Sequence, residues 1–312
     1  MTTEVDLQDL LDTLTEDTKT ELAYTPTVED WNGSLDVASL PIKVRKWIKV
    51  PDIVAVVADL KNSTKLGTGK RAASTASIYQ AATGGVVETF DQFDADFIQI
   101  QGDGAFALFW GDRRYERAMC AGITIRTFSD DLVERLEFKW PTIAETGFKV
   151  GIASGRVLVK RIGTPRNPAQ QEPVWAGKPV NYAAKAAQCA DRHQVIVTGS
   201  VWDKISGNDY LTISCGCDGN GNPTSPGTSI WEDMTIERLP EAEPERVGRR
   251  LIAPWCKVHG PEFCAAILAG KRVRSDAAEA RMRLLISQMG NAVRVKAAND
   301  RENRRRLAGI LW

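Results

Sequence analysis

The stretch DFIQIQGDGAFALFW, residues 96–110, places an aspartate between two glycines, with an apolar run on each side. It predicts two strands, FIQIQ and AFALFW, joined by a short turn at Gly102-Asp103-Gly104. Such a turn is common in hairpins, so Asp103 by itself indicates no function. Its interest depends on which other polar residues the fold brings beside it.

A second strand pattern precedes this hairpin. The run DIVAVVAD, residues 52–59, is rich in β-branched residues and is typical of a strand buried on both faces. It ends on Asp59, which could simply cap the next helix. If the strands pair, however, Asp59 and Asp103 lie beside each other at one end of the sheet.

The rest of the chain alternates between helix and strand patterns. These patterns predict a helix over 4–22, a helix over 70–83 ended by Gly84-Gly85, a helix over 113–137, two strands in 148–163 around Ser154-Gly155, a Pro-rich loop over 165–173, a helix over 178–190, a strand at 194–199, a β-ribbon over 211–236 and a helix over 275–310. From residue 50 to 200 this order suits an α/β sandwich, with helices packed on one sheet.

The composition is that of a globular protein. Of 312 residues, 43% are hydrophobic and 26% are charged, and no apolar run reaches the length of a membrane span. The acidic start, MTTEVDLQDL, lacks the pattern of a signal peptide. Six cysteines without an export signal indicate reduced thiols or metal ligands. We therefore expect a cytoplasmic protein that does not associate with membranes.

The charge is unevenly distributed, although the net charge is zero. Residues 1–40 hold ten Asp or Glu and one Lys, whereas residues 271–312 hold eleven Lys or Arg and four Asp or Glu. A basic tail can bind nucleic acid. This tail lacks interleaved aromatic residues before Trp312, so we favour contact between the acidic and basic ends, within one chain or across a dimer.

Asp59 and Asp103 together suggest a cation site. Two carboxylates at one sheet edge repel each other, and a shared cation removes this penalty. Mg²⁺ binds one or two carboxylates together with substrate phosphate oxygens. The polar turn LKNSTKLGTGK, residues 60–70, follows Asp59 and enters a helix whose first N–H groups could bind phosphate. This arrangement is typical of nucleotidyl or phosphoryl transfer.

A later helix adds two polar residues. In AGKPVNYAAKAAQ, residues 176–188, Asn181 and Lys185 are four apart and therefore share one helical face. Asn181 could bind a ribose oxygen, and Lys185 could neutralise charge on a reacting phosphate. The alternative is a solvated helix surface without a function.

These segments resemble the signature segments of class III nucleotidyl cyclases. The resemblance rests on VVADLKNSTKL (56–66), IQIQGDGAFALF (98–109) and VWAGKPVNYAAKAAQ (174–188), and it extends over about residues 50–236. It implies an α+β fold with a ferredoxin-like α/β sandwich and a βααββαβ core. We expect an acidic helical segment at 1–45, the cyclase domain at 46–240 and a basic, helical C-terminal extension at 241–312.

The resemblance also implies roles for individual residues. Two chains of the family join head to tail and form their sites between them, so we expect a homodimer. The implied roles are metal binding (two Mg²⁺ or Mn²⁺) by Asp59, Asp103 and the carbonyl of Leu60, triphosphate binding by Asn62, Ser63 and Thr64, ribose binding from the partner chain by Asn181, and transition-state stabilisation by Lys185.

Two departures from the family pattern bear on the substrate. The family usually places Arg where this chain has Lys185, and Lys keeps the charge but loses the bidentate geometry. At the base-reading positions this chain has Gln99 and, near the second position, Val174 and Trp175, which match neither the adenylate nor the guanylate pattern. Trp175 could narrow the pocket to suit a one-ring base, and Gln99 offers a donor and an acceptor.

This pattern is similar to that of the pyrimidine cyclases of bacterial anti-phage (Pycsar) systems. The similarity implies that UTP is converted to cyclic UMP, a second messenger that activates a downstream effector. CTP, and then GTP or ATP, are the alternative substrates. Rival functions are a diguanylate cyclase or palm polymerase, a non-catalytic nucleotide sensor, and a nucleic-acid binder using the basic tail.

The cysteines raise a separate question. Cys215 and Cys217 are followed, after 38 intervening residues, by Cys256 and His259. This CxC…CxxH pattern could form a tetrahedral structural zinc site that joins the loop of the last ribbon to the tail. The alternative is a set of reduced thiols with a surface histidine.

Overall fold

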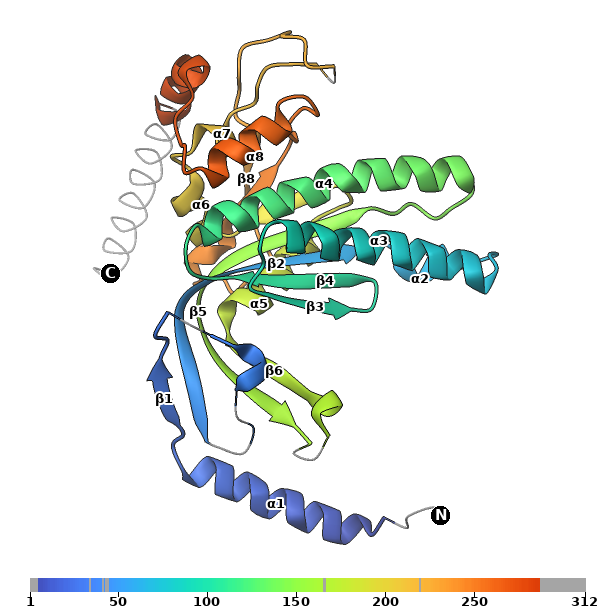
Figure 1. Cartoon of the computed structure of the whole chain (residues 1–312), viewed down its shortest axis with the longest axis vertical. Helices are drawn as coiled ribbons and strands as arrows, with labels where there is room; N and C mark the ends of the chain where they lie inside the picture. The colour runs from blue at the N-terminus through green and yellow to red at the C-terminus, as the bar shows by residue number, and fades with distance from the viewer. Residues whose placement is uncertain are drawn as a thin grey trace, which may run out of the picture. The chain divides into compact units, whose positions relative to one another are not determined.

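The computed structural model describes residues 5–33, 35–40, 42, 45–164, 167–218 and 220–286 (Figure 1). The described residues form two compact units. The smaller unit draws on Met1–Asp52 and Arg156–Gly177, and the larger unit on Ile53–Gly155 and Lys178–Trp312. No described helix is both long and apolar enough to cross a membrane.

The larger unit contains most of the elements. Its own helices and strands are α2 (Ser63–Leu66), α3 (Ala72–Gln92), β3 (Phe97–Gln101), β4 (Gly104–Phe109), α4 (Arg114–Lys139), α5 (Lys178–Cys189), β7 (Gln194–Val197), α6 (Gly199–Ile205), α7 (Asp209–Thr212), β8 (Trp231–Thr235), η3 (Pro244–Arg246), β9 (Val247–Leu251), α8 (Gly260–Leu268) and η4 (Ser275–Ala277).

Two long strands, β2 (Lys46–Leu60) and β5 (Phe148–Gly163), contribute residues to both units. The sheet order is β3-β4-β2-β5-β7-β9-β8. The element order from β2 to β5 is the βααββαβ core, which confirms the predicted fold class.

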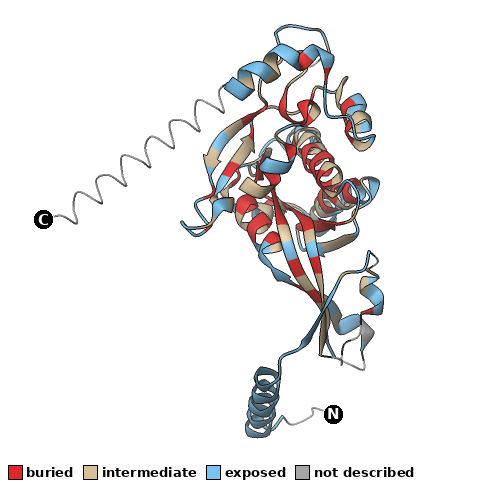
Figure 2. Cartoon of the chain, turned by 90° about the vertical axis from the view of Figure 1, so that its left-hand side faces the viewer, coloured by how far each residue is buried: buried red, intermediate tan, exposed pale blue. Residues whose placement is uncertain are grey.

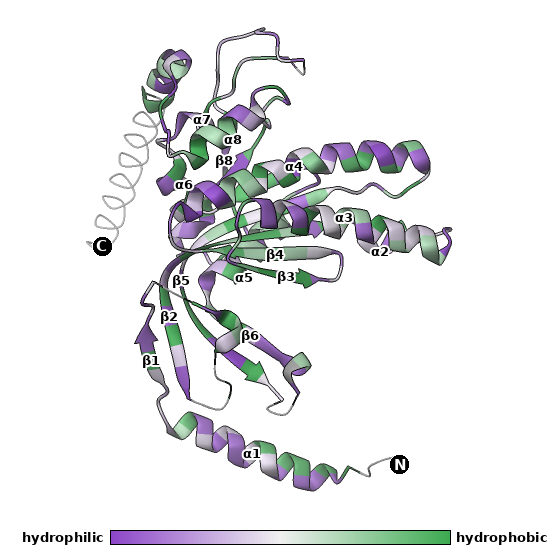
Figure 3. Ribbon diagram, in the orientation of Figure 1, coloured by the Kyte–Doolittle hydropathy of each residue, from purple (hydrophilic) through white to green (hydrophobic). Residues whose placement is uncertain are grey.

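The smaller unit contains α1 (Leu7–Ala23), β1 (Thr27–Asp30), η1 (Val37–Ser39), η2 (Pro168–Gln170) and β6 (Gln171–Gly177). Within it, β1 pairs in parallel with the start of β2, and β6 pairs antiparallel with the end of β5. Helix α1 buries none of its residues (Figure 2). Its leucines alternate with acidic residues along the helix (Figure 3).

Two glycines of the larger unit set the layers of its sheet. A Cβ on Gly122 of α4 would lie 2.7 Å from Cδ1 of Ile152, so α4 packs against this residue of β5. A Cβ on the neighbouring Gly151 would lie 2.0 Å from the carbonyl oxygen of Ala183 in α5. Since successive residues of a strand point to opposite faces, α4 and α5 cover opposite faces of the sheet. The expectation of helices packed on one sheet holds, but they lie on both sides of it.

The glycine pair at 84–85 does not end a helix, so that prediction was wrong. Helix α3 runs through both residues, and a Cβ on Gly85 would lie 2.3 Å from Cζ of Phe128 in α4. The glycine therefore permits close contact between two helices, and this contact outweighs the low helix propensity of glycine.

The prediction of two strands around Ser154-Gly155 was also wrong, because β5 is continuous. Gly155 has a φ of 146°, which lets the strand bend without ending. The predicted loop over 165–173 is shorter than expected, since β6 begins at Gln171.

The predicted ribbon over 211–236 is only partly present. Residues up to Thr212 belong to α7, and β8 pairs with β9, a strand the sequence patterns did not indicate. In the predicted helix over 275–310, η4 and the helical residues 278–286 are described. The remainder lies outside the described residues.

Candidate active site

The hairpin turn of β3 and β4 brings Asp103 to the end of β2. Ala58 of β2 pairs with Ala105 of β4, so Asp59 lies opposite Gly104. A Cβ on Gly104 would lie 2.3 Å from the carbonyl oxygen of Ala58, which explains the glycine after Asp103. The glycine before it, Gly102, has a φ of 65°, as a two-residue hairpin turn requires. Both glycines thus serve to hold Asp103 next to Asp59.

The sheet register places Asp59 on the face that α5 covers. Val54, Val56 and Ala58 belong to the apolar core, and Val54 pairs with Phe109, whose ring contacts Phe90 of α3. Because side chains alternate along a strand, Asp59 points to the opposite face. Gln99 lies on that same face, since it pairs with Phe106, which pairs in turn with Val57.

Asp59 has an ion-pair partner that the sequence analysis did not identify. The Nζ atom of Lys149 lies 2.6 Å from Oδ2 of Asp59, with the two side chains 18% and 41% exposed. Lys149 sits between Phe148 and Val150, which are fully buried. A charged residue directly between two apolar residues that the strand pattern buries was the signal that could have revealed it.

The turn after Asp59 is anchored by hydrogen bonds to the segment before β5. Thr146 is 1% exposed, and its hydroxyl donates to the carbonyl oxygen of Lys61 at 2.7 Å. The amide of Asn62 donates to the carbonyl oxygen of Glu145 at 2.9 Å, and Asn62 has a φ of 56°. The Asn62 side chain therefore shapes the turn, whatever its part in substrate binding.

The remaining residues of the turn lie as follows. Leu60 is 2% exposed and belongs to the core. Ser63 and Thr64 form the start of α2, a single helical turn, where Ser63 is half-buried and Thr64 is exposed. The backbone of residues 60–64 is thus fixed on one side by the core, while its other side reaches solvent.

Lys61 and Asp191 hold this turn against the end of α5. Nζ of Lys61 lies 2.5 Å from Oδ1 of Asp191 and 3.3 Å from Oε2 of Glu145. The hydrogen bond to Asp191 raises the pKa of Lys61, and the same bond lowers the pKa of Asp191. The pair stays charged near neutral pH and fixes the turn beside Asp59.

Helix α5 presents Asn181 and Lys185 at its surface. Asn181 is exposed and Lys185 is half-buried, with its Nζ atom 5.9 Å from the ring centroid of Tyr182. Burial raises the pKa of Tyr182 despite the nearby Lys178. The Tyr182 hydroxyl therefore stays protonated, and the side chain uncharged, near neutral pH. Contact of Gly151 with the α5 backbone fixes the helix on the sheet.

Val174 and Trp175 belong to the smaller unit, on β6. Trp175 pairs with Val159 and is 9% exposed, whereas Val174 is 39% exposed. Their role in reading the base stays a prediction.

The donor set at the end of β2 fits a hard divalent cation. Asp59 and Asp103 supply partly exposed carboxylates, and Mg²⁺ and Mn²⁺ prefer such oxygen ligands. Lys149 neutralises one of these carboxylates when no cation is bound. The site can thus hold a cation beside a polar turn, on the sheet face that also carries Gln99.

Comparison with known proteins gives close relatives. A uridylate cyclase from Micromonospora echinofusca is 57% identical over 303 residues, which is 97% of each chain. A uridylate cyclase from Propioniciclava tarda is 49% identical over 304 residues, which is 96% of each chain. No protein-family model matches the sequence.

Two solved structures share the fold. An adenylyl cyclase from P. aeruginosa superposes with a TM-score of 0.52 at 12% identity, covering 66% of this chain and 96% of that one. A class III adenylyl cyclase-like ATP-binding protein from Pseudomonas aeruginosa has a TM-score of 0.50 at 16% identity, covering 91% of this chain and 53% of that one.

Proposed function

This chain belongs to the family of the uridylate cyclases from Micromonospora echinofusca and Propioniciclava tarda, and we propose from that premise that it converts UTP to 3′,5′-cyclic UMP and pyrophosphate. It is a nucleotide cyclase. One structural observation supports the chemistry best: the two glycines of the β3–β4 turn hold Asp103 beside Asp59, at the end of β2 where a polar turn begins.

The reaction joins two atoms of one substrate. The ribose 3′ oxygen attacks the α-phosphorus and loses its proton, while the bond from that phosphorus to the pyrophosphate oxygen breaks. Asp59 and Asp103 would hold two Mg²⁺ or Mn²⁺ ions, with the carbonyl of Leu60 as a further ligand. Such ions make the 3′ hydroxyl more acidic and balance charge on the triphosphate.

The protein groups orient the reacting atoms. Asn181 would hold the ribose, and the Lys185 ammonium would balance the charge that develops on the α-phosphate. The ring of Tyr182 beneath Lys185 restricts the directions this ammonium can take. Ser63 and Thr64, at the start of α2, would contact the triphosphate.

The site would be completed by a second copy of the chain. Asn181 lies on the exposed surface of α5, whereas Asp59 lies at the end of β2 and Asp103 in the β3–β4 turn. In a head-to-tail dimer each site would take Asp59 and Asp103 from one chain and Asn181 and Lys185 from its partner. Two equivalent sites would follow from the two-fold symmetry.

Co-expression of two inactive variants tests this arrangement. One variant carries Asp59→Asn with Asp103→Asn, and the other carries Asn181→Ala with Lys185→Ala. Random pairing makes half of the dimers mixed, and each mixed dimer has one intact site, so roughly a quarter of the wild-type activity returns. If the mixture stays inactive while mixed dimers are isolated, the sites are not shared.

The choice of base would rest on Gln99. Its amide can donate to the uracil O4 oxygen, which is an acceptor where cytosine carries an amine. The function is tested by incubating the protein with each of the four NTPs and Mn²⁺, with product mass and pyrophosphate as readouts. Cyclic CMP or a cyclic purine nucleotide as the main product would contradict the choice of UTP.

The product would act as a second messenger in anti-phage defence, through an effector protein that binds cyclic UMP. This role is supported by the similarity to pyrimidine cyclases of Pycsar systems. It predicts that cells lose protection against phage when Asp103→Asn replaces the wild-type enzyme.

A further inference from the structure

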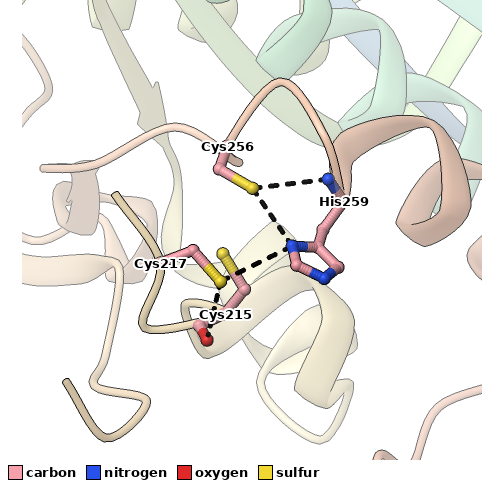
Figure 4. Close-up of side chains that lie close together, drawn as sticks. All are labelled: Cys215, Cys217, Cys256 and His259. Atoms are coloured by element: carbon pink, nitrogen blue, oxygen red, sulfur yellow. Dashed lines mark hydrogen bonds between the residues drawn. The ribbon is translucent and has the colours of Figure 1, made fainter. Parts of the chain in front are cut away.

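Four potential metal ligands lie together, well separated in sequence from the proposed nucleotide site. The ligand atoms of Cys215, Cys217, Cys256 and His259 all lie within 4.8 Å of one another (Figure 4). Among the described residues this is the one group of three or more Cys, His, Asp or Glu ligands with this spacing. All four belong to the larger unit.

The local backbone is shaped to bring these side chains together. Gly216 has a φ of 70°, and a Cβ on it would lie 1.9 Å from the carbonyl oxygen of Ser225, so only glycine fits between Cys215 and Cys217. On the other side, the backbone N–H of His259 donates to Sγ of Cys256 at 3.3 Å. An N–H donor of this kind stabilises a thiolate that binds a metal.

Hydrogen bonds alone account poorly for the cluster. Nδ1 of His259 lies 3.2 Å from Sγ of Cys256 and 3.6 Å from Sγ of Cys217. A neutral ring nitrogen has either one proton to donate or one lone pair to accept with, so it satisfies only one of the two sulfurs well. Several donors converging on one point are the usual arrangement around a shared cation.

The separations match a tetrahedral zinc site. With a Zn–S bond of about 2.3 Å and a Zn–N bond of about 2.0–2.1 Å, tetrahedral geometry puts sulfur and nitrogen about 3.6 Å apart and two sulfurs about 3.8 Å apart. Nδ1 of His259 lies 3.2 and 3.6 Å from two sulfurs, and no ligand pair exceeds 4.8 Å. Small side-chain rotations are enough to place the ion.

We propose that Cys215, Cys217, Cys256 and His259 bind one structural Zn²⁺ ion. Three thiols release their protons to the solvent on binding, and the neutral imidazole binds through Nδ1. All four positions are filled by protein groups, so no position is left for a substrate. The soft thiolates select zinc over the hard cations that suit Asp59 and Asp103.

The ion would link two segments that are distant in sequence. Cys217 lies in the long connection from α7 to β8, and Cys256 lies just before α8. Trp255, next to Cys256, is 6% exposed and contacts the ring of Phe263 in α8 at 6.4 Å. A cavity of about 420 Å³ is lined by Cys215, Cys217 and Cys256, which gives the ion a path from solvent. Zinc would thus fix the connection onto the α8 end of the core.

Metal content tests the proposal. Untagged protein is purified without chelators, and its zinc content is measured by inductively coupled plasma mass spectrometry. The wild type should hold about one zinc per chain. Cys217→Ser should lose most of it. The matched control Cys189→Ser, a cysteine of α5 outside the cluster, should keep it, as should Asp103→Asn.

A second measurement does not depend on any variant. Replacing zinc by Co²⁺ in the wild-type protein should give visible absorption typical of tetrahedral thiolate coordination. Wild-type protein that contains no zinc and binds neither added Zn²⁺ nor Co²⁺ would overturn the proposal. So would a stable disulfide between Cys215 and Cys217 in protein purified under reducing conditions.

Discussion

The Lys149 ammonium lies 2.6 Å from the carboxylate of Asp59, the residue before the last of the central strand β2. A cation is thus already placed where the proposed nucleotide site needs one. This pair balances the charge of Asp59 without a metal, and metal binding has to replace or share that interaction.

Replacing Lys149 by methionine should therefore tighten metal binding. A partly exposed ion pair is worth up to about 1 kcal/mol, so the affinity for Mn²⁺ should rise about fivefold. Electron paramagnetic resonance of Mn²⁺ gives the binding curve directly. Lys204→Met, an exposed lysine on α6, controls for the change in net charge. Equal binding in Lys149→Met would show that the ion pair does not compete with the metal, and weaker binding would show that Lys149 supports the metal site.

Asp59→Asn and Asp103→Asn should each abolish cyclisation. Each loses a charged ligand, and the lost charge stabilisation of several kcal/mol lowers kcat by at least about 100-fold. Thermal unfolding should stay close to that of the wild type, because both carboxylates are partly exposed. Normal turnover in both variants would remove the basis for the metal assignment.

Lys185 should act through its charge. Lys185→Ala should lower kcat by about 10²–10³-fold, the usual loss for a group that stabilises developing charge. Lys185→Arg should stay within about tenfold of the wild type, because Arg keeps the charge. Steady-state kinetics with UTP separates kcat from KM. An effect confined to KM would assign Lys185 to ground-state binding only.

Gln99→Glu should alter the choice between pyrimidines. Glutamate only accepts hydrogen bonds, so it loses the donor to uracil O4 but can accept from the cytosine amine. The ratio of kcat/KM for UTP to that for CTP should fall at least about tenfold. Gln101→Glu, on the same strand and face, is the matched control. An unchanged ratio in Gln99→Glu would mean that another residue reads the base.

His193 should titrate below the ordinary histidine range. Burial is the largest cause of its lowered pKa, and Arg126 and Arg192 add to it, while Asp130 and Glu137 oppose it. The unfolded chain then binds more protons than the folded one as pH falls below about 6.5, so stability decreases from that pH towards the folded pKa.

Urea unfolding at several pH values, with NMR titration of the imidazole, measures both effects. His193→Asn is a suitable variant, because His193 has a φ of 60° and asparagine tolerates that conformation. The variant should lose less stability on acidification than the wild type. A pKa of His193 at or above 6.5 would contradict this expectation.

The sequence was sufficient to predict the elements of the candidate site where the local sequence signals agreed with the fold. The Gly-Asp-Gly turn, the buried run ending on Asp59 and the polar face of 178–190 were all recognisable, because turn chemistry and periodicity are local properties. The two glycines of the turn serve different purposes, a positive φ at Gly102 and close backbone contact at Gly104. Only the second of these depends on a strand far away in the sequence.

Tertiary contacts explain what the sequence did not predict. Gly85 looked like a helix end because its partner, Phe128, lies in another helix. The ion pair between Lys149 and Asp59 forms because β5 lies next to β2 in the sheet, and this strand order is not a local property of the sequence. The four zinc ligands were recognisable as a spacing pattern, but only the fold of the connection after α7 brings them within 4.8 Å.

We propose above that the enzyme makes cyclic UMP. The most direct test of this proposal is a single reaction that contains equal concentrations of UTP, CTP, GTP and ATP with Mn²⁺, in which mass spectrometry follows all four cyclic products over time. We expect that cyclic UMP forms first and in large excess, and that the Asp103→Asn variant forms none. Predominant formation of any other cyclic nucleotide, or none at all by the wild type, would contradict it.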